Sequence, residues 1–171
     1  MHDIDLATWV LGEYPMEVYS AANSCIPEIA AIDDFDNVTI TMKFPSGSLC
    51  LIDLCRYANY GYDQRLEAFG PKGMICAENM KPNVAVVSDA SGASVVPMYY
   101  SFPSRHSDGY RLQLDSFLDV VDGRGEASVT DKMTIAISRI ADACENSARY
   151  DGTNPLVRLM FSSVNCLHYM L

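Results

Sequence analysis

Apolar and polar side chains alternate strictly between residues 38 and 43, where valine, isoleucine and methionine are separated by threonine and lysine. A period of two residues is typical of a strand with one buried face. A Pro-Ser-Gly turn follows at residues 45–47. Further short apolar runs come after it on short connections, at residues 48–54, 66–69 and 74–77. We therefore predict an antiparallel meander of four strands.

The rest of the chain contains further strands and then a change of period. Additional strands are predicted at residues 16–20, 83–89 and 94–101, and the last is placed at a sheet edge because Pro97 cannot donate a ladder hydrogen bond. Apolar stripes with helical spacing predict helices, the last of them capped by Thr130 or Asp131. These helices cover residues 1–12, 107–121 and 130–148. Strands followed by helices indicate an α+β fold: a largely antiparallel open sheet of six or seven strands with helices packed on one face.

The strand at 48–54 is apolar on both of its faces. Leu49, Leu51 and Asp53 share one face, while cysteine, isoleucine and leucine at positions 50, 52 and 54 share the other. The run at 74–77 repeats this two-sided pattern. A single layer of helices covers only one face of a sheet, so the other face needs a second cover. We predict a homodimer or a tetramer in which sheet faces are opposed.

Composition and charge exclude several classes of protein. The 171 residues are 49% hydrophobic and carry a net charge of −10, which is typical of a globular domain and unfavourable for binding nucleic acid or anionic membrane surfaces. No segment is apolar over the ~18 residues of a membrane span, and none has the pattern of a signal peptide. The six cysteines form no C-x-x-C pair and have no histidine at ligand spacing. We expect a cytoplasmic protein with reduced, mostly buried thiols and no metal site.

A candidate binding segment separates the second and third strands of the meander. It reads Arg-Tyr-Ala-Asn-Tyr-Gly-Tyr-Asp over residues 56–63. In an extended chain Tyr60 and Tyr62 point to one face, where two hydroxyls can hydrogen-bond a polyol; the alternative is that both rings only pack. Arg56 and Asn59 are weaker candidates. A structural ion pair for Arg56 and a turn cap formed by Asp63 are equally good interpretations.

Three stretches together carry a resemblance to a known family. They read HDIDLATWVLGE, RYANYGYDQRLEAFGPKGM, and FPSRHSDGYRLQLDSFLDVVDGRGEASVTDKMTIAISRIADACENSARYDG. Together they resemble the C-terminal domain of the Gfo/Idh/MocA oxidoreductases, and most of all its inositol 2-dehydrogenase branch. The resemblance implies a substrate-binding and oligomerisation domain over residues 1–155. It leaves residues 156–171 as a divergent tail, containing His168, for which we have no function.

The family also implies a cofactor domain that this sequence does not show. Members bind NAD or NADP through an N-terminal domain with a G-x-G-x-x-G turn and a Glu-Lys-Pro motif. The first motif does not occur in the 171 residues, and Lys81-Pro82 follows methionine rather than glutamate. We therefore expect no cofactor-binding residues and no NAD(P) binding by this chain alone.

The same resemblance suggests a catalytic histidine. The family's Asp-x-x-x-His pattern places its histidine at His2, and the aspartate would precede Met1. Histidine suits removal of a hydroxyl proton as hydride leaves, although His2 is also interpretable as an ordinary terminal residue. His106 is expected to be a solvated helix end. The parent reaction would be oxidation of a secondary alcohol of a cyclitol or sugar, with this truncated chain inactive by itself. The alternatives are a non-catalytic oligomerisation or interaction module and a gene-model fragment.

Overall fold

The computed structural model describes residues 1–150 and 157–158 and divides the chain into two units. The first unit contains residues 1–56 and the described residues from 128 onward, and the second contains residues 57–127. The first unit comprises α1 (His2–Leu11), β1 (Glu17–Asn23), α2 (Pro27–Ala30), β2 (Asn37–Lys43), β3 (Leu49–Cys55), α5 (Asp131–Arg149) and β8 (Val157–Arg158). The second comprises β4 (Leu66–Gly70), β5 (Gly73–Ala77), β6 (Val86–Asp89), β7 (Gly92–Val95), α3 (Phe102–Arg105) and α4 (Ser107–Val121).

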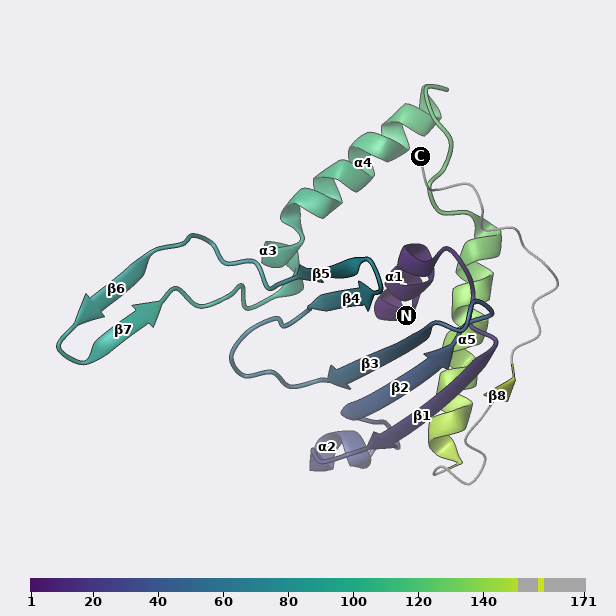
Figure 1. Cartoon of the computed structure of the whole chain (residues 1–171), viewed down its shortest axis with the longest axis horizontal. Helices are drawn as coiled ribbons and strands as arrows, with labels where there is room; N and C mark the ends of the chain where they lie inside the picture. Colours follow the sequence, from purple (N-terminus) through teal and green to yellow (C-terminus); the bar gives the residue numbers. More distant parts are fainter. Residues whose placement is uncertain (151–156, 159–171) are drawn as a thin grey trace. The chain divides into compact units, whose positions relative to one another are not determined.

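The first unit is an antiparallel sheet in the order β3-β2-β1-β8, with α5 lying along one face (Figure 1). The alternation predicted for residues 38–43 is confirmed, since Ile40 and Met42 are buried while the threonines and Lys43 are exposed. In this register Ile40 lies opposite Ser20 of β1 and Ile52 of β3. The apolar face of three strands is thereby aligned beneath the helix.

The core of the first unit lies between this sheet and its helices. Val18 and Met42 from the sheet and Ile140 from α5 are fully buried, and Ile4 and Ala7 of α1 join the same cluster. α5 is amphipathic, with small residues on its buried side as well as isoleucines. Burial of this face is the main stabilising term of the unit.

A buried polar contact fixes how α5 approaches the sheet. The Ser147 hydroxyl of α5 accepts a hydrogen bond of 2.9 Å from the backbone N–H of Ser20 in β1, and both serines are fully buried. A serine allows the helix to come close to the strand and satisfies a backbone donor that would otherwise be costly to bury.

The opposite face of the β1–β3 sheet is uncovered within the described residues. Leu49 and Leu51 of β3 are 71% and 72% exposed. The prediction that this strand is apolar on two faces, with helices covering one of them, therefore agrees with the structure.

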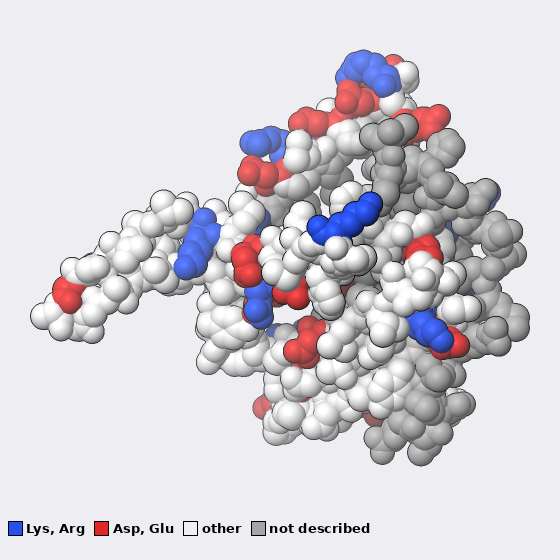
Figure 2. Space-filling model, in the orientation of Figure 1, with Lys and Arg blue, Asp and Glu red and all other residues white. Residues whose placement is uncertain are grey.

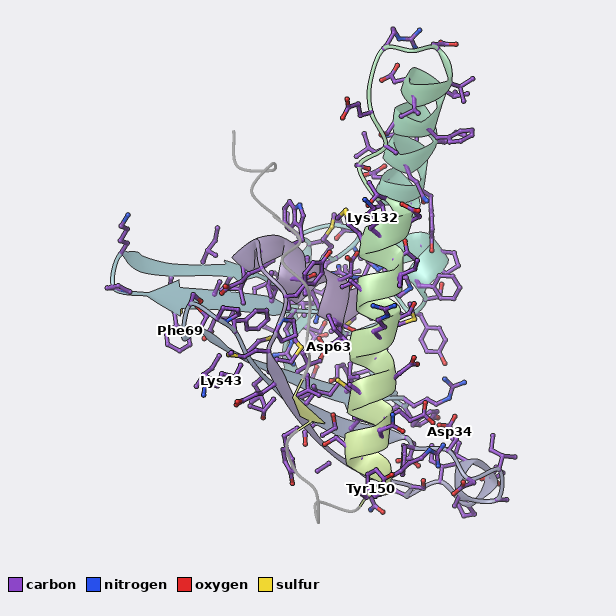
Figure 3. All side chains as sticks on the ribbon, turned by 90° about the vertical axis from the view of Figure 1, so that its right-hand side faces the viewer. Asp34, Lys43, Asp63, Phe69, Lys132 and Tyr150 are labelled. Atoms are coloured by element: carbon purple, nitrogen blue, oxygen red, sulfur yellow. The ribbon has the colours of Figure 1, made fainter. Side chains whose placement is uncertain are left out.

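The second unit consists of two hairpins, β4–β5 and β6–β7, followed by α3 and α4. Gly61 is the only buried residue between positions 57 and 127. Phe69 of β4, labelled in Figure 3, is 81% exposed, and Ile75 of β5 is 72% exposed. In the view of Figure 2 the β6–β7 hairpin is almost free of charged groups apart from an acidic side chain at its tip. This unit thus has no hydrophobic core of its own.

The α+β class and the antiparallel pairing are confirmed, but the strands do not form one sheet of six or seven. They hydrogen-bond in three groups: the four-stranded sheet, β4–β5 and β6–β7. The connection from β3 to β4 is held by its own hydrogen bonds, described below, and it does not make a hairpin. The strand predicted at 94–101 was too long, because β7 ends at Val95, ahead of Pro97, which has no backbone donor. The short helices α2 and α3 were not predicted.

The cysteines are less buried than expected. None of the five described cysteines is in a disulfide, and Cys144 is buried in the core, but Cys25, Cys55 and Cys76 are exposed. The expectation of burial is wrong for these three because they lie in a loop, at the end of β3 and on the uncovered β5. No helix among the described residues is both long and apolar enough to cross a bilayer.

We expect Ile140→Ala to lower the free energy of unfolding by about 2–5 kcal/mol, because it opens a cavity in a fully buried position of α5. The matched control is Ile135→Ala in the same helix, where the side chain is 51% exposed and the change should stay within about 0.5 kcal/mol. Urea unfolding followed by circular dichroism measures both. Equal effects in the two variants would contradict the packing described here.

Candidate functional site

The binding segment predicted at residues 56–63 contains a tight turn that only glycine can complete. The backbone N–H of Gly61 donates to the carbonyl of Ala58 at 3.3 Å, which places Asn59 and Tyr60 at the tip of a turn. Gly61 has φ of +140°, and a Cβ added there would come within 2.3 Å of the Met98 side chain. Any other residue at this position would be strained and would displace Met98.

Beyond this turn the segment is fastened to other parts of the second unit through its backbone. The N–H of Tyr62 donates to the carbonyl of Tyr99 at 2.8 Å. The N–H of Gln64 donates to the Asn79 side chain, and the Gln64 carbonyl accepts from the Arg105 guanidinium, both at 2.9 Å. Residues 61–64 are therefore held at successive points although they form no regular secondary structure.

The carboxylate of Asp63, which Figure 3 labels, is the centre of the side-chain contacts. Arg65 donates to it through Nε at 2.8 Å and through Nη2 at 3.0 Å, a bidentate ion pair. The Tyr60 hydroxyl donates to Oδ2 at 2.7 Å, and the Asn79 amide donates to Oδ1. The Asp63 side chain is only 15% exposed. The pKa of Asp63 is lowered to about 2, first by the hydrogen bonds from Arg65 and then by the one from Asn79.

Tyr62 has different surroundings from Tyr60. Its ring packs against Phe102 with centroids 6.4 Å apart and meets the ring of His106 edge-on at 5.6 Å. The Tyr60 ring is 59% exposed. The two tyrosines were predicted to act as a pair. Their contacts differ, because Tyr60 has an exposed hydroxyl oriented by Asp63, whereas the ring of Tyr62 packs against other rings. His106, expected to be a solvated helix end, is instead half-buried beside Tyr62.

The remaining predicted residues make none of these contacts. Asn59 is exposed in the turn. His2 is exposed as the first residue of α1, and Arg56 is exposed just after β3, where its N–H donates to the carbonyl of Asp36 at 2.8 Å. His2 and Arg56 belong to the first unit. Their roles stay predictions, as do those of the tyrosines, and His168 lies outside the described residues.

Sequence reasoning missed Asn79, Arg65 and Arg105, which organise the segment. Asn79 lies 16 positions from Asp63 and bridges it to Gln64 through the two ends of one amide. Arg105 carries buried Nε and Nη1 atoms with no hydrogen-bond acceptor among the described residues. Only the Asp-x-Arg spacing of Asp63 and Arg65 was a local signal that pattern analysis could have used.

The described residues offer no ready position for a metal or a dinucleotide. They contain no group of three or more histidine, cysteine, aspartate or glutamate side chains that could hold a metal ion. None of their helices begins at a glycine-rich G-x-G-x-x-G turn, the arrangement that binds a pyrophosphate. What the cluster presents to solvent is chiefly the exposed Tyr60, whose hydroxyl is oriented by Asp63.

Comparison with known proteins gives consistent matches. Residues 1–156 match the family described as "Oxidoreductase family, C-terminal alpha/beta domain" (GFO_IDH_MocA_C). The chain is 32% identical to an inositol 2-dehydrogenase of Rhizobium meliloti, over 86% of this chain and 45% of the relative. It is 37% identical to a myo-inositol 2-dehydrogenase of Thermotoga maritima, over 69% of this chain and 36% of the relative.

A solved structure matches as well. A myo-inositol dehydrogenase from Corynebacterium glutamicum aligns with a TM-score of 0.81 and 34% identity, covering 94% of this chain and 48% of its own. The chain thus spans less than half the length of each of these relatives.

Asp63→Asn should destabilise the second unit by about 1–2 kcal/mol at neutral pH, a value reduced for the 61% exposure of Arg65. Because the folded-state pKa of about 2 lies below the ordinary 3.8, this stabilisation is complete above about pH 4. It is lost as the pH falls from there through about 2. Hydrogen exchange of the amides in residues 62–79, measured from pH 7 to pH 3, follows the effect. Asp115→Asn on α4 is the control, and an Asp63→Asn effect that does not shrink toward pH 3 would contradict the ion pair.

Proposed function

Because the chain belongs to the Gfo/Idh/MocA oxidoreductase family, we propose that it is the substrate-binding part of an NAD(P)-dependent dehydrogenase that oxidises a secondary alcohol of a cyclitol or sugar. The observation that carries this proposal is the match along most of the chain to relatives named as inositol dehydrogenases. The described cysteines form no disulfide, which supports a cytoplasmic location.

The chemistry of the tyrosine turn supports a polyol ligand. A cyclitol carries no charge and many hydroxyls, so it is bound through hydrogen bonds rather than ion pairs. Tyr60 presents an exposed phenol whose hydroxyl is oriented by Asp63, and Asn59 presents an exposed amide in the same turn. Because the chain bears a net charge of −10, an anionic sugar phosphate would be a poorer ligand.

The reaction itself needs a proton acceptor and a hydride acceptor at one carbon. His2 is the proposed base, since imidazole accepts a proton near neutral pH. We assign no cofactor-binding residue to this chain, because the described residues do not fit a pyrophosphate. In this proposal the hydride acceptor is held by a nucleotide-binding domain of the kind that the family's N-terminal part provides, and the 171 residues contribute the substrate side of the site.

The 171-residue chain should bind myo-inositol, and Tyr60→Phe should weaken that binding by about 1 kcal/mol, roughly fivefold. Ligand-observed NMR titration measures the affinity, with NADH as a ligand that is expected not to saturate. Tyr100→Phe removes the same hydroxyl from a 79% exposed ring and should leave the affinity unchanged. Absence of inositol binding, or equal binding by wild type and Tyr60→Phe, would reject the proposed site.

A second candidate function is self-association, which the uncovered apolar surfaces favour. Leu49 and Leu51 project from the face of the β1–β3 sheet opposite the helices, and Thr39 and Thr41 lie on the same face. Lys43 and Asp53 also lie on this face, so the leucines form a small apolar group among polar side chains. Exposed apolar groups on a sheet face mark interaction sites. We therefore propose a homo-oligomer formed through this sheet face, either in addition to substrate binding or as an interaction module without catalysis.

Sedimentation velocity at micromolar concentration should show a species larger than the 18.9 kDa monomer. Leu51→Asp should shift it toward the monomer, because the substitution places a charge in the apolar contact. Ile32→Asp is the matched control: Ile32 is also 72% exposed but lies beside α2, away from the sheet. A folded wild-type monomer with no concentration dependence would overturn this proposal.

A further inference from the structure

The hydrogen bond between Tyr60 and Asp63 has a fixed direction. An ionised carboxylate has no proton to give, so at a separation of 2.7 Å the Tyr60 hydroxyl must be the donor. A phenol carries a single hydroxyl proton, and that proton is directed at Asp63. Any other group that approaches the Tyr60 oxygen must therefore donate a hydrogen bond to it.

The surroundings of Asp63 prevent this direction from reversing. Arg65 occupies both carboxylate oxygens with N–H donors, and Asn79 donates to one of them. Protonating the carboxylate would set an O–H against these donors. The low pKa of Asp63, about 2, agrees with this geometry. Reversal is thus disfavoured wherever the Asp63 carboxylate is ionised.

The two partners of the Tyr60–Asp63 hydrogen bond differ in their exposure to solvent. The Asp63 side chain is 15% exposed, whereas the Tyr60 residue is 59% exposed. A ligand arriving from solvent can therefore reach the tyrosine more readily than the carboxylate. The carboxylate acts on such a ligand only through the tyrosine.

We propose that Asp63 is a positioning residue that determines ligand specificity, because it makes the Tyr60 oxygen an obligate hydrogen-bond acceptor. The ligand group facing Tyr60 has to be a hydroxyl or another donor, and a ketone, ether or fluorine at that point is rejected. This inference rests on the proposed function, since it concerns the polyol site at Tyr60. It adds the requirement that the ligand group at Tyr60 donate a hydrogen bond, which the position of the tyrosine alone does not give.

The test compares myo-inositol with its monodeoxyfluoro analogues, in which one hydroxyl at a time is replaced by a fluorine that cannot donate. Affinities for the 171-residue chain are measured by ligand-observed proton and fluorine NMR. For wild type we expect at least one ring position at which fluorine weakens binding about tenfold. We call the affinity for myo-inositol divided by the affinity for the analogue the fluorine ratio. In Tyr60→Phe, which leaves the Asp63 carboxylate and its other donors in place, the fluorine ratio at that position should fall below about twofold.

Asp63→Asn tests the role of the carboxylate. With its nitrogen at the Oδ2 position, the asparagine amide gives up the hydrogen bond from Arg65 Nη2 and donates to the Tyr60 oxygen instead. The phenol proton is thereby released toward the ligand, so the fluorine ratio should again fall below about twofold. The matched control is Asp89→Asn in the β6–β7 turn, where the carboxylate accepts from the backbone of Ser91 and should not affect the ratio.

The outcomes separate the inference from the function on which it rests. If wild type does not bind inositol, or if Tyr60→Phe binds it as wild type does, the proposed site and the inference both fail. If Tyr60→Phe weakens inositol binding while Asp63→Asn keeps the wild-type fluorine ratio, the site stands and the inference alone is wrong. The inference is supported if the fluorine ratio falls in both Tyr60→Phe and Asp63→Asn and stays at the wild-type value in Asp89→Asn.

Discussion

Packing of α5 against β1, β2 and β3 is the interaction on which the first unit depends. It joins the last described helix to strands from the first third of the chain, and it buries Ile140, Val18 and Met42 completely. The hydrogen bond from Ser20 to Ser147 sets the close approach of helix and strand. The second unit, residues 57–127, lies between β3 and α5 in sequence, so the chain leaves the first unit after β3 and returns to it before α5.

The second unit is organised by hydrogen bonds where the first is organised by apolar burial. Its strands and α4 expose large apolar side chains, and the ordered contacts gather around Asp63, Gln64 and Tyr62. A hydrogen-bond network that is shielded from solvent specifies the geometry of its groups more sharply than apolar packing does. It is stabilising only if every donor and acceptor in it has a partner. A binding segment benefits from this property because its hydroxyls have to be oriented, while the apolar surfaces around it remain available for contacts with other protein.

The sequence was informative where a local pattern decides the structure. The two-residue period at 38–43 and the helical stripe at 131–149 follow from burial on one face, so both elements were predicted to within a residue or two. The single six- or seven-stranded sheet was wrong, because the pairing of β4 and β6 with other strands is a long-range property that no local pattern encodes. The segment at 56–63 was identified by its unusual composition. Its partners Asn79 and Arg105 could not be, since they reach it from 16 and 41 residues away.

The position of the second unit between β3 and α5 also separates two kinds of constraint on the sequence. Among the described residues, the core cluster under α5 draws no side chain from residues 57–127, so a substitution in the tyrosine turn does not change the side chains that form that core. Within the turn Gly61 is constrained, because its backbone conformation and its contact with Met98 admit no side chain. A side chain at position 61 would have to displace Met98, so we expect the chain to tolerate substitution at the exposed Tyr60 more readily than at Gly61.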